Sequence, residues 1–145
     1  MFGSPLEERP LDPAVTRELS RRQLAEPTQY LDELGMQVID KPGKYISVSL
    51  RTMSWRVSPT APRALEVLGL PFETAWSSNR TALVRHLEAA GEQQLAGDYV
   101  TFYLRAWDYF LSGNQDEQAG SDALLAGARV LARGIEIGRA GEPTP

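Results

Sequence analysis

The chain has 145 residues, 42% of them hydrophobic, and a formal net charge of −4, which is typical of one globular domain. It contains no cysteine, which excludes disulfides, thiolate metal sites and thiol nucleophiles, and its only histidine is His86. The N-terminus has no basic region followed by an apolar run, and no window approaches 18 uninterrupted apolar residues. No motif for catalysis, metal binding or cofactor binding stands out. We therefore expect a cytoplasmic protein with no membrane span, no metal and no cofactor.

The N-terminal third begins with residues 1–11, which are rich in proline and acidic residues and predict a flexible arm. Asp12 followed by Pro13 is typical of a helix start, with aspartate as the N-cap and proline at the first helical position. We expect helical structure over residues 12–35.

Residues 36–57 change to a period of two, which predicts a β-hairpin with its turn at residues 41–44. Ile46, Val48 and Leu50 point to one face of the second strand. After Thr52 the phase flips, which indicates a bulge. Because two strands alone are marginally stable, helices or a partner must cover them.

The same segment carries a basic patch, since five cations and no acid lie between residues 41 and 65. Aromatic residues among the cations favour nucleic-acid binding, whereas the acidic pI near 5.0 argues against it. An acidic protein partner fits equally well, and solvated charges on a strand edge are a third alternative. The basic-patch candidates are Lys41, Lys44, Arg51, Arg56 and Arg63.

Beyond a linker at residues 58–62, the sequence predicts helices over residues 63–140. The helix expected at 92–112 confines its polar residues to one narrow stripe, so it is apolar over more than half of its circumference. Such a helix is either central in the fold or faces a partner. The stripe consists of Gln94, Asp98, Thr101, Arg105, Asp108 and Ser112, in which Arg105 and Asp108 are spaced to form an ion pair.

The last predicted helix, which starts at Ser121, carries glycines at seven-residue spacing on its apolar face. Each interior glycine costs about 0.5–1 kcal/mol relative to alanine, so a close approach must offset the loss. Three alternatives remain open: an aromatic side chain of the preceding helix, another protein chain, or a small ligand. The resulting interface candidates are Gly127, Leu131, Gly134, Gly138, Tyr99, Tyr103 and Trp107.

Together these patterns predict a single α+β domain over residues 12–140, with four to six helices, one β-hairpin and a disordered tail at 141–145. An all-α fold is the fallback. The function expected first is that of a non-enzymatic binding or assembly protein, which works through helix-packing surfaces with a protein partner or as a homo-oligomer. The alternatives are binding of nucleic acid or an acidic partner through residues 41–63, and a small ligand-binding domain or enzyme. The pocket of that last alternative would be lined by Trp76, Tyr99, Tyr103 and Trp107.

Overall fold

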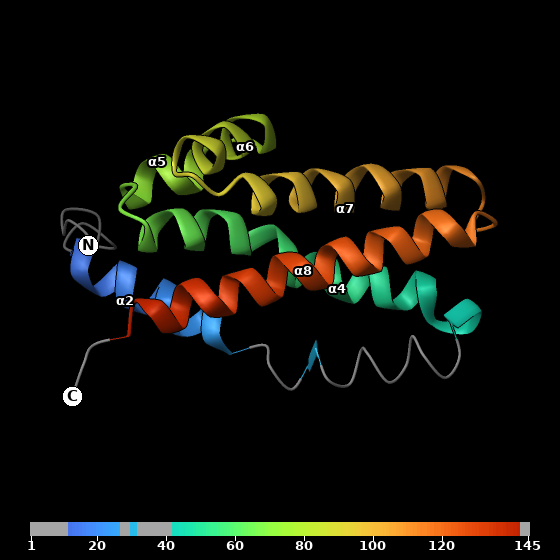
Figure 1. Cartoon of the computed structure of the whole chain (residues 1–145), viewed down its shortest axis with the longest axis horizontal. Helices are drawn as coiled ribbons and strands as arrows, with labels where there is room; N and C mark the ends of the chain where they lie inside the picture. Colours follow the sequence, from blue (N-terminus) through green and yellow to red (C-terminus); the bar gives the residue numbers. More distant parts are fainter. Residues whose placement is uncertain (1–11, 27–29, 32–41, 143–145) are drawn as a thin grey trace, which may run out of the picture.

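A computed structural model describes residues 12–26, 30, 31 and 42–142. Within these ranges the chain is all-helical, so the predicted α+β fold is wrong and the all-α fallback is correct. The predicted arm at 1–11 and first strand at 36–40 lie outside the described residues, as does most of the predicted tail. The helices that lie wholly within the described residues are α2 (Pro13–Ala25), α4 (Pro42–Val67), α5 (Phe72–Ser77), α6 (Arg80–Ala89), α7 (Gln93–Leu111) and α8 (Glu117–Ala140) (Figure 1).

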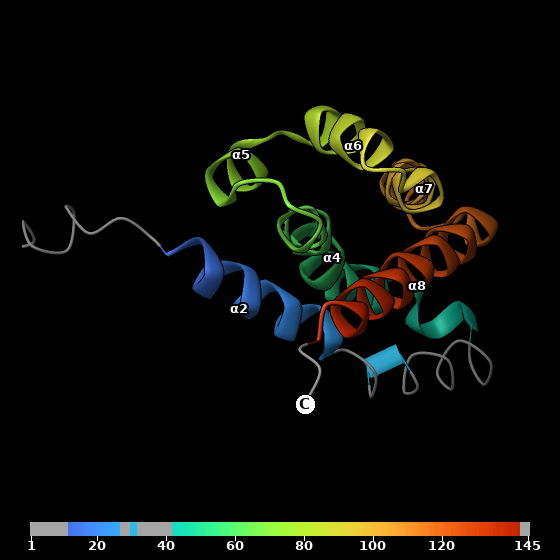
Figure 2. The same ribbon diagram turned by 60° about the vertical axis from the view of Figure 1, so that its left-hand side comes forward.

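Three long helices, α4, α7 and α8, form the centre of the fold (Figure 1). The α8 helix packs on both α4 and α7, and α4 and α7 run in opposite directions. Helix α2 packs on α4 and α8, whereas α6 lies beside α7 and α5 beside α4 (Figure 2). The core therefore lies where α4, α7 and α8 meet, and the outer edges of α4 and α7 have fewer neighbours.

Most helix ends lie where local sequence signals predict them. The Ala14 N–H donates to the Asp12 carboxylate at 2.9 Å, so Asp12 is the N-cap of α2. Helices α6 and α7 end just before Gly91 and Gly113, whose positive φ values of +83° and +69° are typical of a glycine that ends a helix. The start of α8 was predicted too late, because Asp116 is its N-cap and accepts the Ala119 N–H at 3.0 Å.

The predicted β-hairpin is wrong over residues 42–57, which belong to α4. The apparent alternation also contains a helical pattern, because four apolar residues follow one another in steps of four, three and four. These residues are all buried: Ile46, Leu50, Met53 and Val57. Val48, expected on the same face as Ile46, is 63% exposed. Packing of this stripe against α8 outweighs the strand preference of its β-branched residues.

The predicted linker at residues 58–62 also lies inside α4, although it contains Pro59 and Pro62. Each proline lacks the N–H that a helix normally donates, which usually breaks the helix. Here the segment is held by burial, because Val57 and Ala61 are fully buried. We infer that tertiary contacts compensate for the helix bonds that the prolines cannot make.

The glycine face of α8 packs against other helices of the same chain. A Cβ atom at Gly127 would lie 2.8 Å from the Phe102 ring and would also collide with Met53. At Gly138 it would lie 2.8 Å from the Arg21 carbonyl oxygen of α2. The glycines therefore let α4, α7 and α2 approach the α8 backbone closely.

Candidate partner-binding groove

Two apolar stripes lie exposed on the outer edges of α4 and α7. The α4 stripe has Val48 and Trp55, which is 85% exposed, seven residues apart. The α7 stripe has Leu104, Trp107 and Leu111, which are 60%, 64% and 67% exposed. Residues at i, i+3 and i+7 share one face of a helix, so the three α7 residues form one apolar ridge, whereas Arg51 lies between the two α4 residues. Exposed apolar side chains grouped in this way make the two helix edges the candidate for a binding surface.

A hollow of about 650 Å³ lies between these stripes, and we call it the aromatic groove. Its walls carry two guanidinium groups, those of Arg51 and Arg80, and no carboxylate among the described residues. The rest of the lining is mainly apolar and aromatic. The lining residues are Leu50, Arg51, Ser54, Trp55, Arg80, Phe102, Tyr103, Leu104, Ala106, Trp107 and Phe110.

Arg80, the first residue of α6, is held in place by aromatic rings of α7. Its guanidinium carbon lies 3.8 Å from the centroid of the Tyr103 ring, a close cation–π contact. The Tyr103 hydroxyl is hydrogen-bonded to the Ser58 hydroxyl of α4. Burial and the neighbouring Tyr103 raise the pKa of the Tyr99 hydroxyl well above its usual range, so Tyr99 stays neutral. The cluster keeps the Arg80 charge at one fixed end of the groove.

A second hollow, of about 500 Å³, lies between α6 and α7 and joins the aromatic groove at Arg80, Tyr103 and Leu104. We call it the α6–α7 hollow. Its remaining walls come from residues one turn apart on the two helices. These are Thr81, Val84, Arg85 and Glu88 on α6, and Tyr99 and Val100 on α7.

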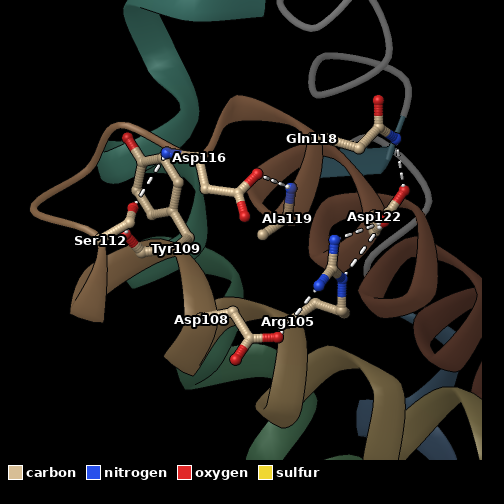
Figure 3. A network of polar contacts seen from close by, with 8 residues as sticks. All are labelled: Arg105, Asp108, Tyr109, Ser112, Asp116, Gln118, Ala119 and Asp122. Carbon is tan, nitrogen blue, oxygen red and sulfur yellow. Dashed lines mark hydrogen bonds and ion pairs between the residues drawn. The ribbon is translucent and has the colours of Figure 1, made fainter.

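The predicted polar stripe of α7 contacts α8 through Arg105, whereas four of its other residues are exposed: Gln94, Thr101, Asp108 and Ser112. Arg105 pairs with Asp108 at 3.0 Å, as its spacing predicts, and also reaches Asp122 of α8 at 3.0 Å (Figure 3). Asp98 is buried and accepts hydrogen bonds from the Gln94 amide at 3.1 and 3.2 Å. The stripe therefore ties α7 to α8 and does not contribute to either hollow.

The predicted interface candidates divide into two groups in the structure. Tyr103 and Trp107 line the aromatic groove, and Tyr99 lines the adjoining hollow. The α8 candidates lie in the packed interior: Gly127, Leu131, Gly134 and Gly138 are all buried.

The predicted basic patch is not one surface. Arg51 lines the aromatic groove, whereas Arg56 and Arg63 line a separate cavity of about 130 Å³ beside Glu26. Arg56 lies over the Tyr30 ring at 4.3 Å, and burial lowers the pKa of the Arg63 guanidinium. Lys41 and the side chain of Lys44 lie outside the described residues.

The aromatic pocket expected from Trp76, Tyr99, Tyr103 and Trp107 is only partly assembled. Trp76 of α5 lies elsewhere, where its indole N–H donates to the buried Glu66 carboxylate at 2.7 Å. The same Glu66 oxygen accepts the Ser20 hydroxyl of α2 at 2.7 Å. This cluster joins α2, α4 and α5 and is structural.

The candidates predicted from the sequence do not include most of the groove residues, among them Trp55, Leu104 and Arg80. The phase flip predicted after Thr52 hides the helical spacing that places Trp55 beside Arg51. Leu104 and Trp107 share the i, i+3 spacing of one exposed ridge, a signal present in the sequence. Arg80 carries no local signal, because only the packing of α6 on α7 brings it to Tyr103.

Among the described residues, no helix is long and apolar enough to cross a membrane. In the same part of the chain, no three Asp, Glu or His side chains are grouped so that they could hold a metal ion. No family model, curated protein or solved structure matches the chain.

Proposed function

We propose that the protein is a non-enzymatic binding protein whose aromatic groove receives an amphipathic, acidic helix of a protein partner. The observation that carries this proposal is the pair of tryptophans, Trp55 and Trp107, exposed on opposite walls of one groove. Tryptophan and arginine are the residue types that most often dominate binding energy at protein interfaces. Their burial by a partner would remove apolar surface from water that the free protein leaves exposed.

The shape of the groove favours a helix as the occupant. The stripes on α4 and α7 each extend over seven residues, or about 10 Å of helix. A helix of about three turns placed along the groove can contact both stripes with apolar residues spaced i, i+3 or i+4, and i+7.

The charge of the groove favours an acidic occupant. Arg51 and Arg80 line it, and none of the described carboxylates does. Acidic residues flanking the apolar face of the partner helix would pair with these guanidinium groups, which also disfavours basic partners.

The test begins by capturing the partner at the groove. A photo-crosslinking residue, p-benzoylphenylalanine, replaces Trp107 in one variant and Leu125 in a matched control. Leu125, like Trp107, is an exposed apolar residue on a long helix, but it lies on α8 and does not line the groove. We expect the Trp107 variant alone to crosslink a partner segment in the source cells, and that segment to be amphipathic and acidic.

The captured segment is then synthesised, and its binding is measured by fluorescence anisotropy. Trp55→Ala and Trp107→Ala should each weaken binding at least tenfold, whereas Leu125→Ala should leave it unchanged. A peptide with lysine in place of each acid should bind more weakly. A basic segment, a second copy of this chain, or affinities unaffected by both tryptophan variants would overturn the proposal.

A further inference from the structure

We propose that the α6–α7 hollow is a binding site for a small apolar monocarboxylate, such as a medium-chain fatty acid. The hollow has a volume of about 500 Å³, within the range of small-molecule sites. It adjoins the groove on which the proposed partner binding rests and shares Arg80, Tyr103 and Leu104 with it, so the test that separates the two uses Val84 and Trp107, each of which lines only one of them.

The body of the hollow is apolar. Val84 of α6 and Val100 of α7 are half-buried on its walls, and Leu104 remains 60% exposed at its edge. A hydrocarbon chain lying over these side chains would cover apolar surface that neither helix covers for the other. The burial of this apolar surface is the contribution of the hydrocarbon part of the ligand to the binding free energy.

A cation that can bind a carboxylate lies at one end of the hollow. Arg80 begins α6, and its guanidinium is held over the Tyr103 ring without an ion pair to any described carboxylate. The Thr81 hydroxyl and the positive end of the α6 dipole lie at the same end. A carboxylate placed there would gain a charge-assisted hydrogen bond from Arg80.

The opposite end limits the length and the charge of the ligand. Glu88 lies eight residues after Arg80 on the same helix, which is about 12 Å along its axis. Arg85 and Glu88, three residues apart on α6, place one charge of each sign toward that end, so no net positive charge there favours a second carboxylate. A straight-chain acid of the size of octanoate fits between Arg80 and Glu88.

Isothermal titration calorimetry with sodium octanoate on the full chain tests the proposal, with octanol and butyrate as comparison ligands. We expect saturable 1:1 binding of octanoate, and affinities at least tenfold weaker for octanol, which lacks the charge, and for butyrate, which lacks the chain.

Two variants separate the head and tail contacts. Arg80→Met removes the charge but keeps a long side chain, and Val84→Glu places a negative charge in the tail region. Each should weaken octanoate binding at least tenfold, while circular dichroism shows an unchanged helix content. Trp107→Ala is the matched control, because Trp107 lines the groove but not the hollow.

The outcomes also separate this site from the proposed partner groove. Val84→Glu should abolish octanoate binding and spare the partner peptide, whereas Trp107→Ala should do the reverse. Absence of saturable octanoate binding at millimolar concentration, equal binding of octanol, or binding that survives both Arg80→Met and Val84→Glu would overturn the proposal.

Discussion

Two glycines of this chain, Gly97 and Gly138, have opposite effects on its stability. Gly97, near the start of α7, is exposed, and an added Cβ atom there meets nothing within 4 Å. Gly138 of α8 faces the α2 backbone, where a Cβ atom would lie 2.8 Å from the Arg21 carbonyl oxygen. The first glycine costs helix stability without any packing gain, whereas the second permits two helices to touch.

Replacing each glycine by alanine should therefore change stability in opposite directions. Gly97→Ala should stabilise the protein by about 0.5–1 kcal/mol, because alanine favours the helix. Gly138→Ala should destabilise it by about 1–3 kcal/mol, because the backbone of α2 must move away. Urea unfolding of both variants measures the two values, and a stabilised Gly138→Ala protein would contradict the close packing of α2 on α8.

One ion pair between side chains predicts that the free energy of unfolding depends on pH. The guanidinium of Arg133 on α8 lies 2.7 Å from the carboxylate of Glu92, a residue whose side chain is 12% exposed. The hydrogen bonds that Arg133 donates lower the pKa of Glu92. A carboxyl group with a lowered folded pKa adds stability above its unfolded pKa of about 4.3, and this is lost as the pH falls toward the folded value.

Glu92→Gln should therefore reduce the free energy of unfolding at pH 7 by about 1 kcal/mol or less, since Arg133 is partly exposed. The difference from the wild type should shrink as the pH falls below about 4. Glu136→Gln is the control, because Glu136 pairs with the same guanidinium at 2.8 Å but is more exposed, so we expect a smaller loss. A difference between the wild type and Glu92→Gln that is constant from pH 7 to pH 3 would contradict this linkage.

At the scale of single elements, α4 shows how a short segment can satisfy two patterns at once. Over residues 45–51, alternation and helical spacing both place Ile46 and Leu50 on one face. They differ at Val48, which a strand would bury beside Ile46 and which α4 exposes to solvent. Residue type favours the strand here, and only the contact with α8 selects the helix.

This difference gives a direct test of α4. Ile46→Ala should cost about 2–4 kcal/mol, because Ile46 is 2% exposed and packs in the core. Val48→Ala should change stability by less than about 0.5 kcal/mol, since its side chain contributes little to the core. In a hairpin the two losses would be similar, so equal values in thermal unfolding would contradict the helix.

At the scale of the whole molecule, one buried carboxylate links three helices. Both hydrogen bonds to Glu66, from Ser20 of α2 and from Trp76 of α5, end on the same Oε1 atom. Residues 20, 66 and 76 have no shared sequence pattern, so this link arises only when the chain is folded.

Glu66→Leu should destabilise the protein by about 2–3 kcal/mol, because two donors lose a charged acceptor. Glu66→Gln should cost less, since one amide oxygen can accept both bonds. Urea unfolding followed by tryptophan fluorescence measures both variants. If Glu66→Leu were as stable as the wild type, the carboxylate would not hold α2 and α5 in place.

Local sequence signals determined much of this protein. The cap at Asp12, the positive-φ glycines that follow α6 and α7, and the wide apolar surface of α7 all follow from interactions within a few residues. The Arg105–Asp108 pair follows from spacing on one helix. These features depend on backbone preferences and local hydrogen bonds, which can be predicted from a few neighbouring residues.

Tertiary structure alone decided the rest. It selected a helix at 42–67 despite two prolines, since the buried face of that helix fits the glycine face of α8. It also separated Arg51 from Arg56 and Arg63, and it brought Arg80 to Tyr103. The aromatic groove and the α6–α7 hollow exist because packed helices leave part of their apolar faces uncovered. Which part is buried depends on neighbours distant in the sequence, and no local pattern specifies these neighbours.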